Sequence, residues 1–339
     1  MSAARIGIDA RLTRQLSDGM QTYVRELVAR LPAVAPEYSY VPFTHGGNFG
    51  FSEQVALPLS MRKAKLDAVH FLSQYVPVLL PRRFVMTVHD LIHLRFPQYF
   101  KTKVGPYYAT VVRRACARAC RVITDDERTV DDLEELLGVN RAKVRVIPLG
   151  VGELFSAPVE PHKAARPYFL YVGNHRRHKD LTTLFAAWSN LPERYAVDLL
   201  LTGPDDFAGE LQQRSSTRRE IAALGYVSAE GLAGYYAGAC ALVQPALREG
   251  FGLPMLEAMA AGCPVVGSAD AVPGALATVA LTFPTSDPAA LGATLARLLD
   301  DEGLRESAIN QGKDVARRLT WDRCARATAD VYREALEEL

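Results

Sequence analysis

The chain is poor in the features that mark several classes of protein. Only five of its 339 residues are cysteine, and they form no CxxC pair. Such an odd, scattered set favours reduced thiols over a disulfide framework. No apolar run approaches the ~20 residues of a membrane-spanning helix, and no signal peptide precedes Ile6. We therefore expect a cytoplasmic chain, with any membrane association peripheral and on the inner face.

Signatures of metal and dinucleotide sites are missing as well. Cys116 and Cys120 lie one helical turn apart, but small core residues explain this spacing better than a shared metal. His89 and His93 have the same spacing without a further ligand nearby. No DxD motif occurs, and the first strand–loop–helix segment lacks the GxGxxG of dinucleotide sites. We therefore expect no metal and no cofactor.

Net charge is small, +1 at pH 7, but it is unevenly divided along the chain. Residues 1–155 hold 21 Lys and Arg against 15 Asp and Glu, whereas the remainder holds 18 against 23. Within 62–121 there are 12 basic and 2 acidic residues. This local excess predicts an anionic surface or ligand on the N-terminal half, for which we favour a membrane over a nucleic acid.

Short apolar strands alternate with helices, which predicts an α/β fold of doubly wound parallel sheets. Residues 5–10 form a strand, 12–21 a glycine-bearing loop and 22–31 a helix. The same pattern restarts at 168–172, after a proline-rich stretch at 152–167 that resembles a linker. We predict one domain over 1–155, a second over 156–320, and a last helix over 321–339.

One stretch, Arg248 to Gly262, organises the second half of the chain. Glu249 is followed by Gly250-Phe251-Gly252, and a short helix then runs through Pro254 to a glycine just past its end. A glycine-rich turn that leads into a helix offers free amides and the positive end of the dipole to an anion. Glu257 lies inside the helix, away from Glu249. The two carboxylates therefore suit separate hydrogen bonds to sugar hydroxyls on either side of a diphosphate.

A second basic loop follows the strand at 168–172. It reads Gly173-Asn-His-Arg-Arg-His-Lys179, and a helix follows from Leu181 to Trp188. Arg and Lys supply positive charge to the oxygens of a leaving diphosphate without a metal. The alternative is a merely solvated basic loop.

The segment EGFGLPMLEAMAAGCPVV, with seven residues between Glu249 and Glu257, resembles the signature of retaining GT-B glycosyltransferases of family 4. The segment FVMTVHDLIHLRFPQYF around His89 resembles the same family. The resemblance implies two Rossmann-like domains that face a central cleft, with the donor on the C-terminal one and the acceptor on the N-terminal one. It also implies that the last helix crosses back to the first domain and that the anomeric configuration is retained.

The resemblance assigns roles residue by residue. Catalysis is expected of Glu249, which contacts the donor sugar, of Lys179 on the diphosphate, and of His89 near the sugar; Glu257 binds the ribose. Donor contacts are expected at Gly173, Arg176, Arg177, His178, Lys179, Gly203, Tyr226, Val227, Glu249, Gly250, Phe251, Gly252, Leu253 and Glu257. Acceptor or cleft contacts are expected at Gly19, Met20, Gln21, His89 and Asp90. The alternative for His89 is a histidine at the edge of the core, held by Asp90.

Several positions depart from the family pattern, namely Gln21, Asp126, Leu149 and Gly274. They motivate the alternative of a catalytically inactive scaffold, and a sugar phosphorylase or hydrolase is a further rival. We expect transfer of a hexose, with mannose from GDP-mannose favoured, to a glycan or lipid-linked glycan in cell-surface polysaccharide synthesis. A predicted helix over 101–121, with Arg114, Arg118 and Arg121 on one face, either contacts anionic lipid or is simply solvated.

Overall fold

The computed structural model describes residues 3–13, 16–100, 104–204, 215 and 219–337. The chain forms two compact units. The first holds residues 1–150 together with 320–339, and the second holds residues 151–319. The first boundary lies five residues before the predicted 155/156, because the turn at 153–156 is helical and packs in the second unit.

The first unit is built on a six-stranded parallel sheet of order β2-β1-β3-β4-β5-β6. Its strands are β1 (Ala4–Asp9), β2 (Tyr38–Phe43), β3 (Ala68–Phe71), β4 (Phe84–Thr87), β5 (Arg121–Thr124) and β6 (Val144–Val146). The chain adds β2 on one side of β1 and then continues from β3 on the other. The strand order therefore reverses between β1 and β3, where ligands bind at the carboxyl ends of strands in such sheets.

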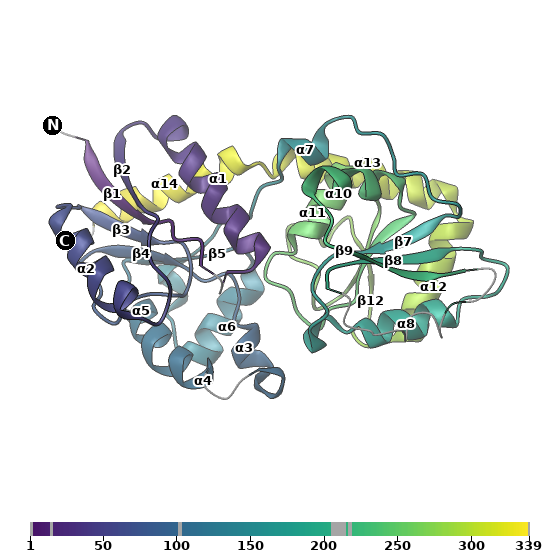
Figure 1. The fold of residues 1–339 in the computed structure, drawn as a ribbon, viewed down its shortest axis with the longest axis horizontal. Coiled ribbons are helices and arrows are strands. Elements are labelled where there is room, and N and C mark those ends of the chain that lie inside the picture. The colour runs from purple at the N-terminus through teal and green to yellow at the C-terminus, as the bar shows by residue number, and fades with distance from the viewer. Residues whose placement is uncertain (1–2, 14–15, 101–103, 205–214, 216–218, 338–339) are drawn as a thin grey trace. The chain divides into compact units, whose positions relative to one another are not determined.

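Helices cover both faces of this sheet (Figure 1). They are α1 (Asp18–Val34), α2 (Leu57–Lys63), α3 (Ile92–Arg95), α4 (Val104–Tyr107), α5 (Arg113–Arg118), α6 (Glu127–Leu137) and α14 (Trp321–Glu337), with π-helical turns η1 (Ser52–Ala56) and η3 (Tyr108–Val112) and 3-10 turns η2 (Pro97–Tyr99) and η4 (Arg141–Lys143). Apolar side chains of α2, η3, α5 and α6 share one buried core with β3, β4 and β5. Helices α1 and α14 pack together on the other face.

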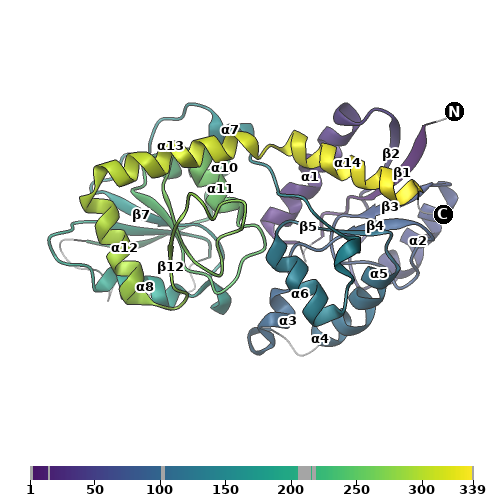
Figure 2. The same ribbon diagram turned by 180° about the vertical axis from the view of Figure 1, so that it is seen from behind.

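The last helix is tied to the first sheet by a buried chain of hydrogen bonds. His70 Nδ1 lies 2.8 Å from the Tyr332 hydroxyl, and its Nε2 lies 2.9 Å from Thr87 Oγ1. The Tyr23 hydroxyl lies 3.0 Å from the same Thr87 oxygen. Burial, assisted by nearby His89, lowers the pKa of His70 to about 3. The neutral imidazole therefore links α14 to β3 and β4. Figure 2 shows the course of α14 along this sheet.

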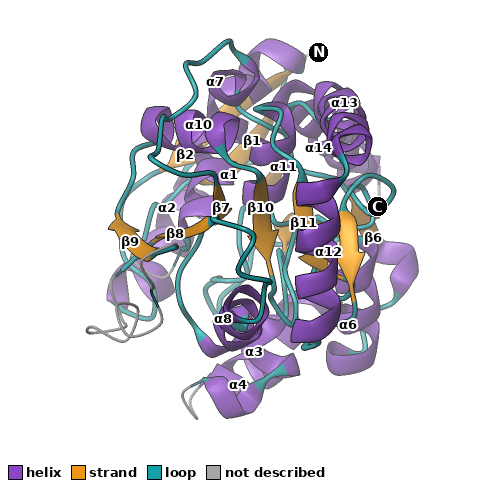
Figure 3. Ribbon diagram, turned by 90° about the vertical axis from the view of Figure 1, so that its right-hand side faces the viewer, coloured by secondary structure: helices purple, strands orange, loops and turns teal. Residues whose placement is uncertain are grey.

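The second unit repeats the architecture with the sheet order β12-β11-β10-β7-β8-β9. Its strands are β7 (Tyr168–Tyr171), β8 (Asp198–Thr202), β9 (Ile221–Gly225), β10 (Ala241–Gln244), β11 (Val265–Ser268) and β12 (Leu281–Phe283). Its helices are α7 (Glu153–Ser156), α8 (Leu181–Ser189), α10 (Ala229–Gly238), α11 (Leu253–Ala260), α12 (Pro288–Asp300) and α13 (Glu302–Arg318), with the 3-10 turn η5 (Arg177–Lys179). Figure 3 shows α8 and α12 on one face and α10, α11 and α13 on the other. The strand order reverses between β7 and β10, which pair directly.

Glycine is required where the chain leaves the first unit. A Cβ at Gly150 would collide with the backbone of Thr320 and Trp321, where the chain returns. One residue further on, the Val151 amide donates to the Leu319 carbonyl at 3.0 Å. The outgoing and returning segments therefore run side by side at this point.

Three local predictions are wrong. Gly19, Met20 and Gln21 do not lie in a loop, because Ser17 caps α1 by accepting from the Met20 amide and the helix begins at Asp18. The helix predicted over 101–121 is α4, a π-helical turn and α5 in its described part, and it ends at Arg118. Arg121 belongs to β5 and pairs with Glu334 of α14, so it is no part of a basic helix face.

Two edge strands, β2 and β12, were not predicted. The described residues contain no helix that is both long and apolar enough to cross a bilayer.

Candidate functional site

The site residues predicted in the second half of the chain gather where the second sheet reverses its strand order. Lys179 follows β7, and Glu249 follows β10. Two hydrogen bonds join the loops that carry them. The Leu247 amide donates to the His178 carbonyl at 2.8 Å, and Gln244 Nε2 donates to the Val172 carbonyl at 2.7 Å. The reversal point of the sheet thus holds the basic loop and the glycine-rich turn as one surface.

Lys179 and Glu249 form an ion pair, with Nζ and Oε1 2.5 Å apart. Their side chains are 14% and 12% exposed. Partial burial limits screening by water, so this contact is stronger than the usual surface pair. The two residues expected to bind diphosphate and sugar therefore satisfy each other in this state.

Helix α11 presents its N-terminus beside this pair. Gly252 is its N-cap, in the left-handed region at φ 70°, and no side chain caps the helix. Within the described residues, the amides of 250–253 donate no hydrogen bond. Uncapped amides at the positive end of a helix form an anion site. At the other end, Gly262 at φ 79° and Cys263 donate back to the Met259 and Ala258 carbonyls, which stops the helix.

Glu257 faces a different partner from Glu249. Its carboxylate accepts from the Tyr236 hydroxyl at 3.1 Å. Burial raises the pKa of Glu257 to about 7, although the hydrogen bond from Tyr236 opposes the rise. A carboxylate that is partly desolvated and retains free acceptor capacity suits a hydroxyl donor, such as those of a ribose.

The remaining predicted donor residues lie around the same edge. Gly203, at φ 105°, follows β8 and approaches so closely that a Cβ would collide with the Gly173 carbonyl. Arg176 and Arg177 are exposed. His178 is buried, so its backbone rather than its side chain shapes the surface.

Two more predicted donor residues, Tyr226 and Val227, come directly after β9. The Tyr226 side chain is 90% exposed. The described residues contain no cluster of His, Cys, Asp and Glu that could hold a metal ion.

In the first unit, His89 lies just past β4 and is buried beside Asp125, which follows β5. His89 Nδ1 lies 2.6 Å from Asp125 Oδ2, and Nε2 lies 3.3 Å from the Leu72 carbonyl. Burial opposes a charge on the ring, but the adjacent carboxylate raises the pKa of His89 overall. Two acceptors facing two ring nitrogens favour the imidazolium. The alternative named Asp90 as the residue that holds a core-edge His89, and this partner is wrong: His89 is buried, but Asp125 and the Leu72 carbonyl hold it, whereas Asp90 accepts from the Ile92 amide.

Sequence reasoning missed a second buried polar cluster, at the point where the first sheet reverses its strand order. Arg11 donates to both carboxylate oxygens of Asp9, at 2.7 and 2.8 Å, and to Glu53 at 3.2 Å. Glu53 also accepts from the Phe49 amide at 2.7 Å. Asp9 is the last residue of β1, and an acidic residue at the carboxyl end of a strand was the available signal. Its partner cluster could not be inferred, because Glu53 of η1 is too distant in sequence.

Comparisons with known proteins place this geometry in a class. Residues 32–152 match the family model described as Glycosyltransferase Family 4, and residues 166–301 match the one described as Glycosyl transferases group 1. Sucrose-phosphate synthase from Thermosynechococcus elongatus is similar over 98% of each chain, with TM-score 0.73 and 22% identity. The Anabaena HepE structure in complex with UDP-glucose is similar over 97% of this chain and 99% of that one, with TM-score 0.70 and 14% identity.

Two relatives are similar in sequence. O-antigen chain mannosyltransferase B from Escherichia coli is 28% identical over 290 residues, which are 81% of this chain and 76% of that one. O-antigen chain mannosyltransferase RfbU from Salmonella typhimurium is 30% identical over 196 residues, 57% of this chain and 53% of that one. The fold is thus that of a GT-B glycosyltransferase. The chain belongs to the group 1 glycosyltransferases of family 4, and it is a transferase.

Proposed function

We propose that the protein transfers a hexose, with mannose favoured, from a nucleotide-diphosphate sugar to a hydroxyl of a glycan or lipid-linked glycan in cell-surface polysaccharide synthesis. The observation that carries the proposal is the pairing of Lys179 with Glu249 beside the free amides of α11. The similarity to two O-antigen mannosyltransferases supports mannose over other hexoses.

In the proposed mechanism, the Lys179 ammonium and the amides at the start of α11 take the part that a metal ion plays in other transferases. The donor diphosphate meets the amides of 250–253 and competes with Glu249 for the Lys179 ammonium. Glu249, once released, accepts a hydrogen bond from a sugar hydroxyl, while Glu257 accepts from the ribose. As the bond from the anomeric carbon to the phosphate oxygen breaks, negative charge grows on the diphosphate. Lys179 and the helix dipole stabilise this charge in place, which is usually the largest catalytic contribution. The acceptor hydroxyl then attacks the anomeric carbon from the side of the leaving group and gives its proton to the departing phosphate oxygen, which retains the anomeric configuration.

Substitution of either member of the pair tests this assignment. We expect Lys179→Ala and Glu249→Ala each to lower turnover ~100-fold or more, the scale for loss of one preorganised charge contact. Lys163→Ala and Glu160→Ala remove an exposed ion pair of the same unit and serve as controls. Turnover of the Lys179 and Glu249 variants within a few-fold of the controls would refute the assignment.

The donor is identified by thermal shift against GDP-, UDP-, dTDP- and ADP-sugars. A donor at 100 times its dissociation constant adds ~2.7 kcal/mol of stability. At one fixed concentration the donor with the lowest dissociation constant therefore gives the largest shift, and we expect this donor to be GDP-mannose. HepE is crystallised with UDP-glucose, and a larger shift with that donor would overturn the preference for mannose.

Product analysis separates the rival reactions. NMR of the glycoside is expected to show a retained anomer, and a chelator is expected to leave turnover unchanged. Release of free sugar or sugar phosphate without added acceptor would instead indicate a hydrolase or phosphorylase. Donor binding without any product from the acceptor panel would favour an inactive scaffold.

The proposed acceptor is lipid-linked, and the proposed partner surface is an anionic membrane that meets the basic region 62–121. The excess of basic residues in that region supports it. Vesicle co-sedimentation that is indifferent to anionic lipid and to salt would count against a membrane partner.

A further inference from the structure

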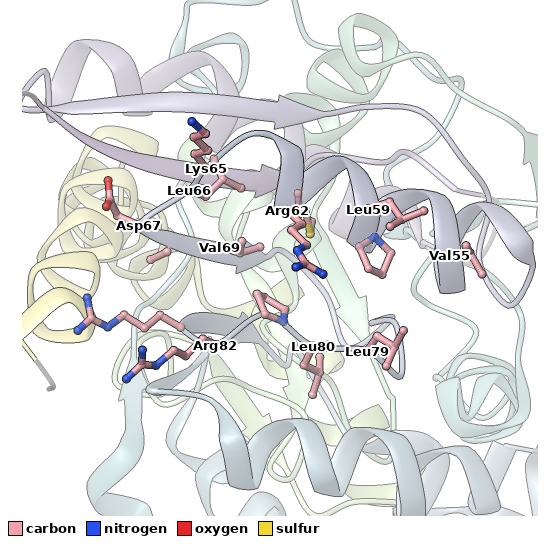
Figure 4. Close-up of a pocket in the computed structure, with 15 residues that line it drawn as sticks. Val55, Leu59, Arg62, Lys65, Leu66, Asp67, Val69, Leu79, Leu80 and Arg82 are labelled. Carbon is pink, nitrogen blue, oxygen red and sulfur yellow. The ribbon is translucent and has the colours of Figure 1, made fainter.

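An open groove of about 760 Å³ lies on the first unit, and η1, which carries Glu53 of the cluster with Asp9 and Arg11, contributes Val55 to it. One wall is η1 with α2, and the facing wall is the segment that leads into β4 (Figure 4). The floor includes the start of β3. Its volume falls in the range of pockets that hold one ligand molecule.

The lining of the groove is largely apolar. It includes Val55, Pro58, Leu59, Met61, Leu66, Val69, Leu79, Leu80 and Pro81. Leu59 on one wall is 53% exposed, and Leu79 on the other is 66% exposed. Of the nine large apolar side chains exposed among the described residues, six lie in 49–59 and 78–79. Such a concentration of exposed apolar side chains marks an interaction site rather than ordinary surface.

Positive charge surrounds the same groove. Arg62, Lys65, Arg82 and Arg83 line it, and none of them takes part in an ion pair within the described residues. Asp67 is the acidic residue of the lining, and its carboxylate accepts from the Arg5 amide at 2.7 Å. Arg95 and Arg145 of the same unit are paired with carboxylates, whereas Arg113, Arg114 and Arg118 of α5 are, within the described residues, as unpaired as those of the groove but lie outside its lining. The uncompensated charge therefore favours an anionic ligand.

Both walls change from apolar to basic in the same direction. Leu59 precedes Arg62 and Lys65 along one wall, and Leu79 precedes Arg82 along the other. In Figure 4, Leu59 and Leu79 lie toward one end of the groove and Lys65 and Arg82 toward the other, with Arg62 between them; Leu66 and Asp67 lie at the end with Lys65. An amphiphile with a hydrocarbon chain and a phosphate matches this order.

The orientation of the groove relative to the sheet distinguishes two possible lipid ligands, a lipid-linked acceptor and a phospholipid of the bilayer. Its basic end lies at the amino edge of the sheet, because β3 and β4 start directly after 65–67 and 82–83. His89 and Asp125 lie at the carboxyl edge. A phosphate at the basic end therefore lies at the opposite edge of the sheet from His89 and Asp125. The sugar of a lipid-linked acceptor would have to lie near these two residues, so its phosphate does not suit the basic end. A phospholipid of a bilayer does not have to reach them.

We infer that this groove and the exposed apolar side chains beside it are a docking site for an anionic bilayer. One acyl chain enters the apolar end, and lipid phosphates meet Arg62, Lys65, Arg82 and Arg83. The inference rests on the proposed membrane partner and relocates it from the helix face that carries Arg114 and Arg118 to the groove. It is independent of the donor.

Vesicle flotation of the full chain tests the site, with phosphatidylcholine vesicles and with equal parts of phosphatidylcholine and phosphatidylglycerol. Only the mixed vesicles are expected to bind the protein. Substituting Arg62, Lys65, Arg82 and Arg83 by Gln is expected to weaken binding about fivefold per charge. The double variant Leu59→Ser/Leu79→Ser is expected to weaken it at least tenfold, and these side chains are exposed, so the fold is kept.

Matched controls locate the effect. Arg113→Gln/Arg114→Gln/Arg118→Gln on α5 and Leu154→Ser in the second unit are expected to leave vesicle binding unchanged. Binding lost in the α5 variant but kept in the groove variants would overturn the inference. So would groove variants that change only the oligomeric state in light scattering, since the face would then join two copies. Turnover with a water-soluble acceptor, unchanged in all these variants, separates failure of docking from failure of the proposed transfer reaction.

Discussion

At the residue scale, Glu257 is a carboxyl group whose charge changes near neutral pH. Its carboxyl is partly buried against Tyr236, and burial raises its pKa to about 7. Folding therefore favours the protonated acid. The stabilisation that this group provides is complete below about pH 4.5 and is lost as the pH rises through about 7. The ionised form, which accepts a ribose hydroxyl best, is the less stable one in the empty protein.

The substitution Glu257→Gln tests whether ionised Glu257 lowers the stability of the empty protein but strengthens donor binding. We expect the variant to gain stability relative to the parent as the pH rises through about 7, by up to about 3 kcal/mol, and to gain little in acid. Donor affinity of the parent is expected to fall as the pH drops through about 7, and that of the variant to stay flat. Titration calorimetry across this range measures both, and parallel pH profiles would contradict the assignment.

At the element scale, α11 has a glycine in the left-handed region at each end. Gly252, at φ 70°, is the N-cap beside the free amides, and Gly262, at φ 79°, ends the helix. The nearest atoms to a Cβ at Gly252 would be those of the Met255 side chain, at 3.5 Å, whereas one at Gly262 would press on the flexible Lys313 side chain. The two positions thus share the same backbone requirement but face different surroundings.

Alanine at each position separates fold from site. Both Gly252→Ala and Gly262→Ala are expected to cost ~1–2 kcal/mol of stability, because a Cβ disfavours the left-handed region. Only Gly252→Ala is expected to reduce donor affinity, since it alone shifts the amides that meet the diphosphate. Thermal unfolding and donor titration of the two variants measure stability and donor affinity. An equal loss of affinity in both would contradict a specific role for the amides beside Gly252.

The properties of single elements explain which of them could be predicted from the sequence. Buried parallel strands such as β4 and β10 are continuous apolar runs, so they were predictable, and so were the polar residues that follow them. Edge strand β2 was missed because Tyr38–Phe43 is only half-buried and carries Pro42. The start of α1 was missed because Gly19 in its first turn resembles a loop residue. The partners of His89, Glu249 and Glu257 come from other elements, and no local pattern encodes such pairings.

At the scale of the whole molecule, each unit has its own sheet and its own core. Every group proposed to hold the nucleotide lies in 151–319, and the groove proposed to meet lipid lies in 1–150. Hydrogen exchange distinguishes the two halves. A bound nucleotide sugar is expected to protect 173–179 and 250–257 and to leave 55–83 unchanged. Anionic vesicles are expected to do the reverse. Protection of 55–83 by the sugar nucleotide alone would contradict this division.

The close approach of the outgoing and returning segments at Gly150 has a consequence for protein engineering. Since the Val151 amide bonds to the Leu319 carbonyl, the segment 151–319 starts and stops at a single spot. A gene fragment that encodes it therefore has ends suited to transplantation, because neighbouring termini tolerate excision and insertion. If the donor and the acceptor bind to different units as proposed, grafting that fragment into a relative, at the positions that correspond to 150 and 320, is expected to exchange the activated sugar and to leave the recipient's choice of glycan intact.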